Sequence, residues 1–143
     1  MKKILIVSAN YYMLIASEMY HEAKTALDES MNPLTGRKQN IKYKLIHVPG
    51  VFEIPVVISK NVKKYDGFIA LGCIIKGETP HFDFISKAAI DGIMKLSIEN
   101  KKPIGNGIVT CLNLKQGLAR RKKGYDAAAA LLSVLDQVKT STE

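Results

Sequence analysis

The sequence has little of what builds disulfide-bonded, metal-binding or membrane-embedded proteins. Its two cysteines, Cys73 and Cys111, lie far apart without a C-x-x-C pair, which favours buried free thiols over a disulfide framework or a zinc site. No apolar run approaches the roughly 18 residues of a membrane-spanning helix. The apolar part of MKKILIVSAN (residues 1–10) is too short for a signal peptide, and no small-residue cleavage site follows it. We therefore expect a buried first strand and a cytoplasmic protein.

Acidic residues are few beside basic ones, 13 against 21, which gives a formal net charge of +8. Nucleic-acid binding is one interpretation of this balance, and solvated faces with an anionic small-molecule ligand is the other. The sequence carries no RRM, KH or zinc-finger signature, and no aromatic residues interleave with the basic runs, so we expect no nucleic-acid partner. The last basic run either stabilises a helix C-terminus or clamps a phosphate. The basic residues concentrate at 37–38, 60–64, 101–102 and 120–123.

Hydrophobic patterning predicts strands that alternate with helices. Residues 3–9 form a nearly continuous apolar run, typical of a strand buried on both faces. Further strands are expected at 41–48, 67–75 and 104–110. Helices are expected from residue 15 to about 27, from 55 to about 64, at 84–100 and at 124–138. Asn113 followed by Gln116 indicates a capping box before a short additional helix.

This alternation implies right-handed crossovers and a parallel sheet covered on both faces. With no linker or long repeat, we expect residues 1–143 to form one α/β domain: three layers, flavodoxin-like, with a four-stranded parallel sheet. Ligands of such sheets bind beyond the carboxyl ends of the strands. An unusual cluster follows each predicted strand, at residues 10–12, 49–53, 77–81 and 110–113. We expect these four clusters to converge on one edge of the sheet.

His81 is the histidine that stands in one of these strand-end loops. Imidazole titrates near neutral pH, so it can exchange protons with a substrate, and Glu78 or Asp83 could orient it. The alternative is a solvent-facing loop histidine. His21 and His47 fall inside a predicted helix and strand, where a structural role is favoured, so we expect no metal site.

Glycines and an aromatic residue at the strand ends indicate ligand contacts of a particular kind. Gly72 and Gly77 have the spacing of a P-loop, but residues 78–79 are Glu-Thr where Lys-Ser/Thr is required, which excludes that mode of nucleotide binding. A glycine turn before a helix can still hold an anion on its backbone N–H groups, or simply be a hydrated turn. Phe52 could stack on a flat heteroaromatic ring or pack into the core. Glu53 needs a partner if its apolar surroundings are buried.

Three stretches resemble the lumazine synthase family: VPGVFEIP at 48–55, YDGFIALGCIIKGETPHFDF at 65–84 and NGIVT at 106–110. The resemblance extends over residues 4–138, and the run G-[EDA]-T-x-H-[FY]-[DE] combined with P-G-x-[FY]-E is specific. It implies condensation of 5-amino-6-(ribitylamino)uracil with 3,4-dihydroxy-2-butanone 4-phosphate, without a metal or an organic cofactor. An amine attacks the ketone, water is lost to give an imine, phosphate is eliminated, and the second amine closes the ring.

The resemblance also implies roles for individual residues. His81 matches the family's proton-transfer histidine. The site of the family lies between adjacent subunits of a pentamer, which in some members is the unit of a 60-subunit shell, and riboflavin synthase is an expected partner. The expected phosphate-binding residues are Gly77, Glu78, Thr79, Arg120 and Lys123. The expected residues for the pyrimidine and its ribityl chain are Tyr11, Val51, Phe52, Glu53, Cys73, Ile74, Ile75 and Asn106.

Three departures from the family pattern bear on ring stacking and assembly. Met1 stands almost at the first core strand, where many relatives carry an additional strand that pairs with a neighbouring subunit. The stretch 120–124 is shorter than the usual glycine-rich connection. Asn106 replaces a common aromatic residue, and Tyr11-Tyr12 replace a common Phe-Asn pair. An archaeal-type riboflavin synthase or a flavin-binding relative remains an alternative, although the intact E-T-P-H run disfavours it.

Overall fold

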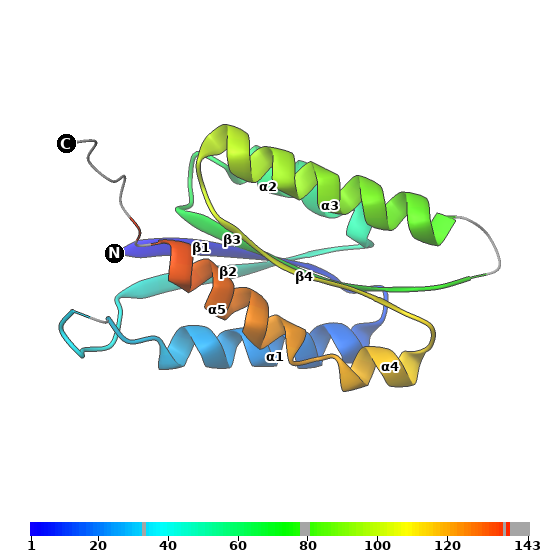
Figure 1. Ribbon diagram of the computed structural model, residues 1–143, viewed down its shortest axis with the longest axis horizontal. Coiled ribbons are helices and arrows are strands. Elements are labelled where there is room, and N and C mark those ends of the chain that lie inside the picture. The colour runs from blue at the N-terminus through cyan, green and yellow to red at the C-terminus, as the bar shows by residue number, and fades with distance from the viewer. Residues whose placement is uncertain (33, 78–80, 136, 138–143) are drawn as a thin grey trace.

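A computed structural model describes residues 1–32, 34–77, 81–135 and 137, and it confirms the three-layer, flavodoxin-like α/β fold. The sheet is parallel, with the strand order β2-β1-β3-β4. Helices α1, α4 and α5 cover one face, and α2 and α3 cover the other (Figure 1). The strands are β1 (Lys2–Ala9), β2 (Ile41–Val48), β3 (Gly67–Ile75) and β4 (Ile104–Cys111). The helices are α1 (Met13–Glu29), α2 (Ile54–Asn61), α3 (His81–Asn100), α4 (Leu114–Ala119) and α5 (Lys123–Leu135).

The sheet separates two hydrophobic cores, and β1 contributes to both. Successive side chains of a strand point to opposite faces, so a strand that is buried throughout must be covered on both sides. Ile4 and Ile6 pack in the core beneath α1 and α5. Leu5 and Val7 pack in the core beneath α2 and α3. This explains why residues 3–9 read as a continuous apolar run rather than an alternating one.

Helix α2 is shorter than its sequence pattern predicts. It ends at Asn61 rather than near Lys64. The Val62 N–H donates to the Ser59 carbonyl, and the Lys64 N–H donates to the Asn61 carbonyl, so the chain leaves the helix in tight turns. The Lys102 ammonium, in the loop between α3 and β4, donates to the Val62 carbonyl at 2.6 Å and satisfies an acceptor just beyond the end of α2.

Other helix boundaries lie close to the predicted ones. Helix α3 begins at His81, three residues earlier than predicted, and the predicted end of the last helix at 138 lies outside the described residues. The capping box before α4 is present: Asn113 Oδ1 accepts a hydrogen bond from the Gln116 N–H at 2.9 Å. The Gln116 side chain reaches back to the Leu112 N–H at 2.8 Å.

The carboxyl ends of the strands meet at one edge, as predicted. Backbone hydrogen bonds extend the pairing past the strand ends, from Asn10 N–H to the Val48 carbonyl and from Lys76 N–H to the Cys111 carbonyl. The segments that follow the strands therefore start side by side. Within the described ranges, no helix is both long enough and apolar enough to cross a membrane.

Ser8 is a fully buried polar residue in the middle of the sheet. Among the described residues, its hydroxyl has no hydrogen-bond partner. Because a buried hydroxyl without a partner costs desolvation free energy, we expect Ser8→Ala to raise the free energy of unfolding by about 1 kcal/mol. Chemical denaturation measures this difference. A lower stability for the alanine variant would show that the hydroxyl makes a stabilising contact.

Candidate active site

A cleft of about 180 Å³ opens between the carboxyl ends of β1 and β3. Cys73, Ile74 and Ile75 from the end of β3 form one side of it, and Tyr11 and Val51 lie on the opposite side. These are five of the residues that the sequence assigns to the pyrimidine and its ribityl chain. The cleft is lined by Ala9, Tyr11, Tyr12, Gly50, Val51, Cys73, Ile74, Ile75 and Ile85.

A short 3₁₀ helix, η1 (Val51–Glu53), forms a wall of the cleft because Gly72 lets it lie directly on β3. A methyl group at Gly72 would lie 2.6 Å from Val51 Cγ2 and 3.2 Å from Ala9 Cβ. Val51 is thereby a buried anchor, whereas the Phe52 side chain is 63% exposed. Of the two interpretations of Phe52, core packing does not hold within this chain, and its ring is free to meet a ligand or a second subunit.

The Glu53 carboxylate turns back toward Gly50, a residue that lines the cleft. Its Oε1 would lie 3.3 Å from a methyl group at Gly50. The backbone agrees with this turn, because the Glu53 N–H donates to the Gly50 carbonyl at 3.2 Å. Glu53 is half-buried, so its carboxylate acceptors lie at the rim and remain accessible to a polar ligand.

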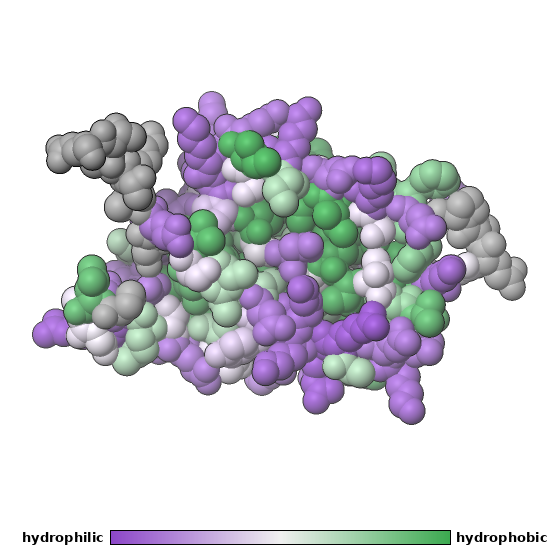
Figure 2. Space-filling view, in the orientation of Figure 1, coloured by the Kyte–Doolittle hydropathy of each residue, from purple (hydrophilic) through white to green (hydrophobic). Residues whose placement is uncertain are grey.

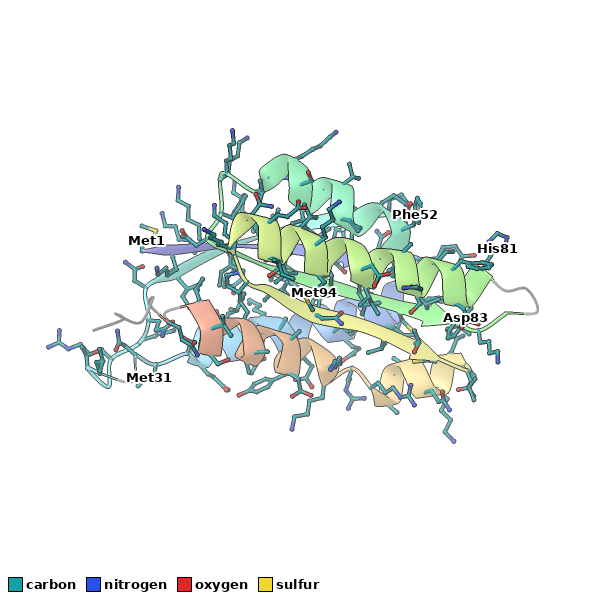
Figure 3. All side chains as sticks on the ribbon, turned by 45° about the horizontal axis from the view of Figure 1, so that its top comes forward. Met1, Met31, Phe52, His81, Asp83 and Met94 are labelled. Atoms are coloured by element: carbon teal, nitrogen blue, oxygen red, sulfur yellow. The ribbon has the colours of Figure 1, made fainter. Side chains whose placement is uncertain are left out.

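His81 begins the helix whose first turn reaches the same cleft. It is the first residue of α3 and is exposed, and Ile85, four residues later, lines the cleft. Residues four apart on a helix lie on one side of it, so His81 lies one turn away from a lining residue without lining the cleft itself. Figure 3 shows His81, Asp83 and Phe52 at the same end of the molecule. The expected pairing of His81 with Glu78 lies outside the described residues.

Cys73 lines the cleft, and Cys111 and Arg120 follow behind it. Arg120 caps α4, and its Nη1 donates to the Thr110 carbonyl at 2.6 Å and lies 3.9 Å from Cys111 Sγ. Burial and the neighbouring Cys111 raise the pKa of the Cys73 thiol to about 12, against an opposing effect of Arg120. Cys73 is therefore a neutral thiol at physiological pH and contributes shape rather than a nucleophile.

We expect Cys73 to resist alkylation in the folded protein. Since the thiolate is the reactive species, a thiol with a pKa of about 12 and 8% exposure should react with iodoacetamide at pH 8 far more slowly than free cysteine. Mass spectrometry of the native and the urea-unfolded protein measures the difference. Equal rates in the two states would contradict the buried, protonated thiol.

Four other predicted residues lie elsewhere or cannot be placed. Gly77 is exposed just beyond β3, and Glu78 and Thr79 lie outside the described residues. Lys123 is exposed at the start of α5.

Asn106 does not reach the cleft within one chain. It lies inside β4 between glycines, where its Oδ1 accepts a hydrogen bond from the Ile108 N–H at 3.0 Å. It is exposed and borders a separate hollow of about 80 Å³ beneath α3.

Sequence reasoning missed several residues that line the cleft. Tyr12 meets the Tyr11 ring edge-on, with 4.9 Å between ring centroids, and burial raises the pKa of its hydroxyl. Ile85 was assigned only to a helix face, but its position four residues after His81 was a usable signal. Tyr12 and Gly50 belong to the strand-end clusters at 10–12 and 49–53 that the sequence predicted to converge, although no ligand contact was assigned to them, whereas Ala9 could be placed only by the fold.

The described residues contain no group of three His, Cys, Asp or Glu side chains that could hold a metal ion. The cleft itself offers apolar and aromatic surface, the elements that border it carry the Glu53 carboxylate and the His81 imidazole, and the Arg120 guanidinium lies close to Cys111. Such a mixture suits a polar heterocycle whose reaction needs proton transfer. Fold and cleft together define a flavodoxin-like α/β protein with a small-molecule site at the carboxyl ends of its strands.

Comparison with known proteins identifies the family. A profile of 6,7-dimethyl-8-ribityllumazine synthase matches residues 1–139. Proteins named 6,7-dimethyl-8-ribityllumazine synthase from Afipia carboxidovorans and Bartonella bacilliformis are 34% and 38% identical, over 93% and 92% of this chain and 83% and 87% of their own lengths. The protein of the same name from Agrobacterium fabrum is 37% identical over 93% of this chain and 92% of its own length. The chain belongs to the 6,7-dimethyl-8-ribityllumazine synthase family, whose members are transferases.

Proposed function

We propose that this chain makes 6,7-dimethyl-8-ribityllumazine from 5-amino-6-(ribitylamino)uracil and 3,4-dihydroxy-2-butanone 4-phosphate, at the cleft between β1 and β3. The observation that carries the proposal is the meeting of η1, the end of β3 and the first turn of α3 around one cleft. This arrangement gathers family-matched residues that are far apart in the sequence. The family match over residues 1–139 supports the same reaction.

In this proposal the cleft holds the pyrimidine ring. Ile74 and Ile75 supply half-buried apolar surface beneath the ring, and the exposed Tyr11 and Phe52 rings cover it from the mouth. Glu53 accepts hydrogen bonds from the ring N–H groups or the ribityl hydroxyls at the rim. Fixing the amine beside the ketone removes much of the entropic barrier to a two-substrate condensation, an effect worth several kcal/mol.

His81 moves protons between the reacting groups. Imine formation transfers protons from the attacking amine to the departing water, and phosphate elimination takes a proton from carbon. An imidazole at the rim can accept and return these protons at physiological pH. Its position at the rim rather than the floor matches a substrate that lies above the apolar surface of β3.

Arg120 binds the phosphate of the second substrate in this proposal. Its contacts with Thr110 and Cys111 both use Nη1, while a guanidinium carries five N–H donors. We expect Arg120→Lys to raise KM for the phosphate substrate about tenfold or more, with a smaller change in KM for the pyrimidine, because bidentate contact is lost. Steady-state kinetics with each substrate varied in turn measures this split. Equal changes in both KM values would remove Arg120 from the phosphate site.

The cleft is completed by a second copy of the chain in this proposal. One chain offers about 180 Å³, less than the roughly 300 Å³ at which small-molecule pockets usually begin. Asn106, whose family counterpart contacts the pyrimidine, lies away from the cleft and would reach a substrate only in a neighbouring subunit.

Exposed apolar surface supports this assembly. Figure 2 shows hydrophobic side chains gathered over α3 and β4, where Met94 is 59% and Ile98 is 68% exposed. Covering such a patch with a second subunit removes apolar surface from water, which stabilises the assembly. We propose a pentamer, which light scattering would report as about five times the 15.8 kDa chain mass. A mass equal to one chain would contradict the shared site.

Mixing the purified protein with both substrates tests the function. The expected result is a fluorescent lumazine with one phosphate released per turnover, faster than in the protein-free mixture. Incubation with lumazine alone separates the remaining alternative, because riboflavin formation there would show a riboflavin synthase. An unchanged rate in the first mixture would contradict the proposal.

A further inference from the structure

Many of the lysines lie at the end of the molecule opposite to the candidate active site, so that site does not explain them. Met1 and His81 lie at opposite ends of the molecule in Figure 3. At the Met1 end the strands begin, and lysines precede or open them: residues 2–3 in β1, 42 and 44 in β2, 63–64 before β3 and 101–102 before β4. Two of the basic runs in the sequence, 60–64 and 101–102, belong to this end.

Five of these lysines line one cleft. The cleft encloses about 690 Å³, within the roughly 300–1,000 Å³ that small-molecule sites occupy. Strand register explains how they meet, since Lys3 pairs with Lys42 and Lys44 follows two residues later on the same face of β2. The turn after α2 places Lys63 and Lys64 beside them. The lysine cleft is lined by Lys3, Lys42, Tyr43, Lys44, Lys63, Lys64 and Tyr65.

No acidic side chain is among the residues that line the lysine cleft. The nearby Asp66 accepts a hydrogen bond from the Lys3 backbone N–H at 2.8 Å. The ion pairs found among the described residues, Lys87–Asp91 and Lys95–Glu99, both lie along α3. Five ammonium groups therefore share one concave surface, where their mutual repulsion favours a multiply charged anion.

The aromatic residues of the lysine cleft indicate which part of an anionic ligand is recognised. The Tyr43 hydroxyl donates to Asp28 Oδ1 at 2.9 Å, and the Tyr65 ring packs edge-on against Phe68 with 6.1 Å between centroids. The Tyr43 hydroxyl and one edge of the Tyr65 ring are therefore held within the chain. The charged groups of the cleft are all lysine ammonium groups, which bind phosphate oxygens as point charges.

We propose that the lysine cleft binds a small molecule that carries two or more adjacent phosphate groups. Such a ligand supplies several negative charges within a volume that the cleft can enclose. An extended nucleic-acid strand would instead need a stripe of charge with stacking surfaces along it. The site lies at the end of the sheet opposite to the candidate active site and is independent of the proposed reaction.

Calorimetry with inorganic tripolyphosphate tests this proposal at 0.15 M salt, where contacts between isolated surface charges are largely screened. The variant Lys42→Gln/Lys63→Gln removes two cleft charges, and Lys24→Gln/Lys115→Gln removes two exposed charges elsewhere. We expect wild type to bind, the cleft variant to lose at least tenfold in affinity, and the control variant to stay within twofold. All three proteins should form lumazine at equal rates.

Three results would overturn the proposal. They are no binding to wild type, equal loss in both double variants, or tighter binding of a single-stranded oligonucleotide than of tripolyphosphate. Equal loss would assign the effect to net charge rather than to the cleft. Repeating the titration with a nucleoside triphosphate distinguishes the source of the phosphates: similar affinity supports recognition of phosphate alone, and tighter binding shows that a nucleoside adds contacts to the same cleft.

Discussion

Replacing His81 by alanine should lower kcat for lumazine formation about a hundredfold, with little change in KM for either substrate. A positioned acid–base group typically contributes 10²- to 10⁴-fold. We expect the lower end of this range because His81 is exposed at the rim, where water can take over part of the proton transfer. A loss confined to kcat is the signature of an interaction made in the transition state rather than in substrate binding.

A second histidine provides the control for this experiment. His21 is also exposed, on α1 outside the cleft, so His21→Ala should leave both kcat and KM unchanged. Wild-type kcat in the His81 variant would remove this residue from the mechanism.

Replacing Gly72 by alanine should destabilise the protein by about 2 kcal/mol, which corresponds to a melting temperature lower by roughly 6 °C. The added methyl group would lie 2.6 Å from Val51 Cγ2, so η1 must shift away from β3. Because η1 also carries Phe52 and Glu53, we expect KM for the pyrimidine substrate to rise as well. Stability and catalysis are thus linked at a residue without a side chain.

Gly77 offers a matched control for the stability measurement. Among the described residues, no atom lies within 4 Å of a methyl group built there, and the residue is exposed. Gly77→Ala should therefore leave the melting temperature within about 1 °C of wild type. If the two variants melt together, close packing of η1 on β3 is not what Gly72 provides.

The fold was predictable from sequence because its strongest signals are local. A nearly continuous apolar run such as residues 3–9 indicates a strand covered on both faces, and four strands with helices between them leave few topologies. The boundaries were less predictable. Helix α2 ends early in tight turns, and the Lys102 ammonium that meets the Val62 carbonyl there comes from 40 residues away, a contact that no local pattern contains.

The candidate site was predictable to the extent that strand ends converge. Val51, Cys73, Ile74 and Ile75 line one cleft because the carboxyl ends of β2 and β3 lie at one edge. The exposure of Phe52 could not be read from sequence, since an aromatic residue in an apolar stretch fits a core equally well.

Asn106 shows a different limit of sequence reasoning. Family position suggests a place near the pyrimidine, yet in one chain the residue borders a separate hollow beneath α3. A contact that forms only between subunits leaves no trace in the patterning of either one. Such residues can be placed only in the assembled protein.

A crystal structure with 5-amino-6-(ribitylamino)uracil bound tests the central claim most directly. The account predicts the pyrimidine ring in the cleft, within contact distance of Ile74 and Val51, with His81 of the same chain at the rim on the side of the reacting amine. A pyrimidine bound elsewhere, or bound with the imidazole turned to the far side of α3, would contradict it.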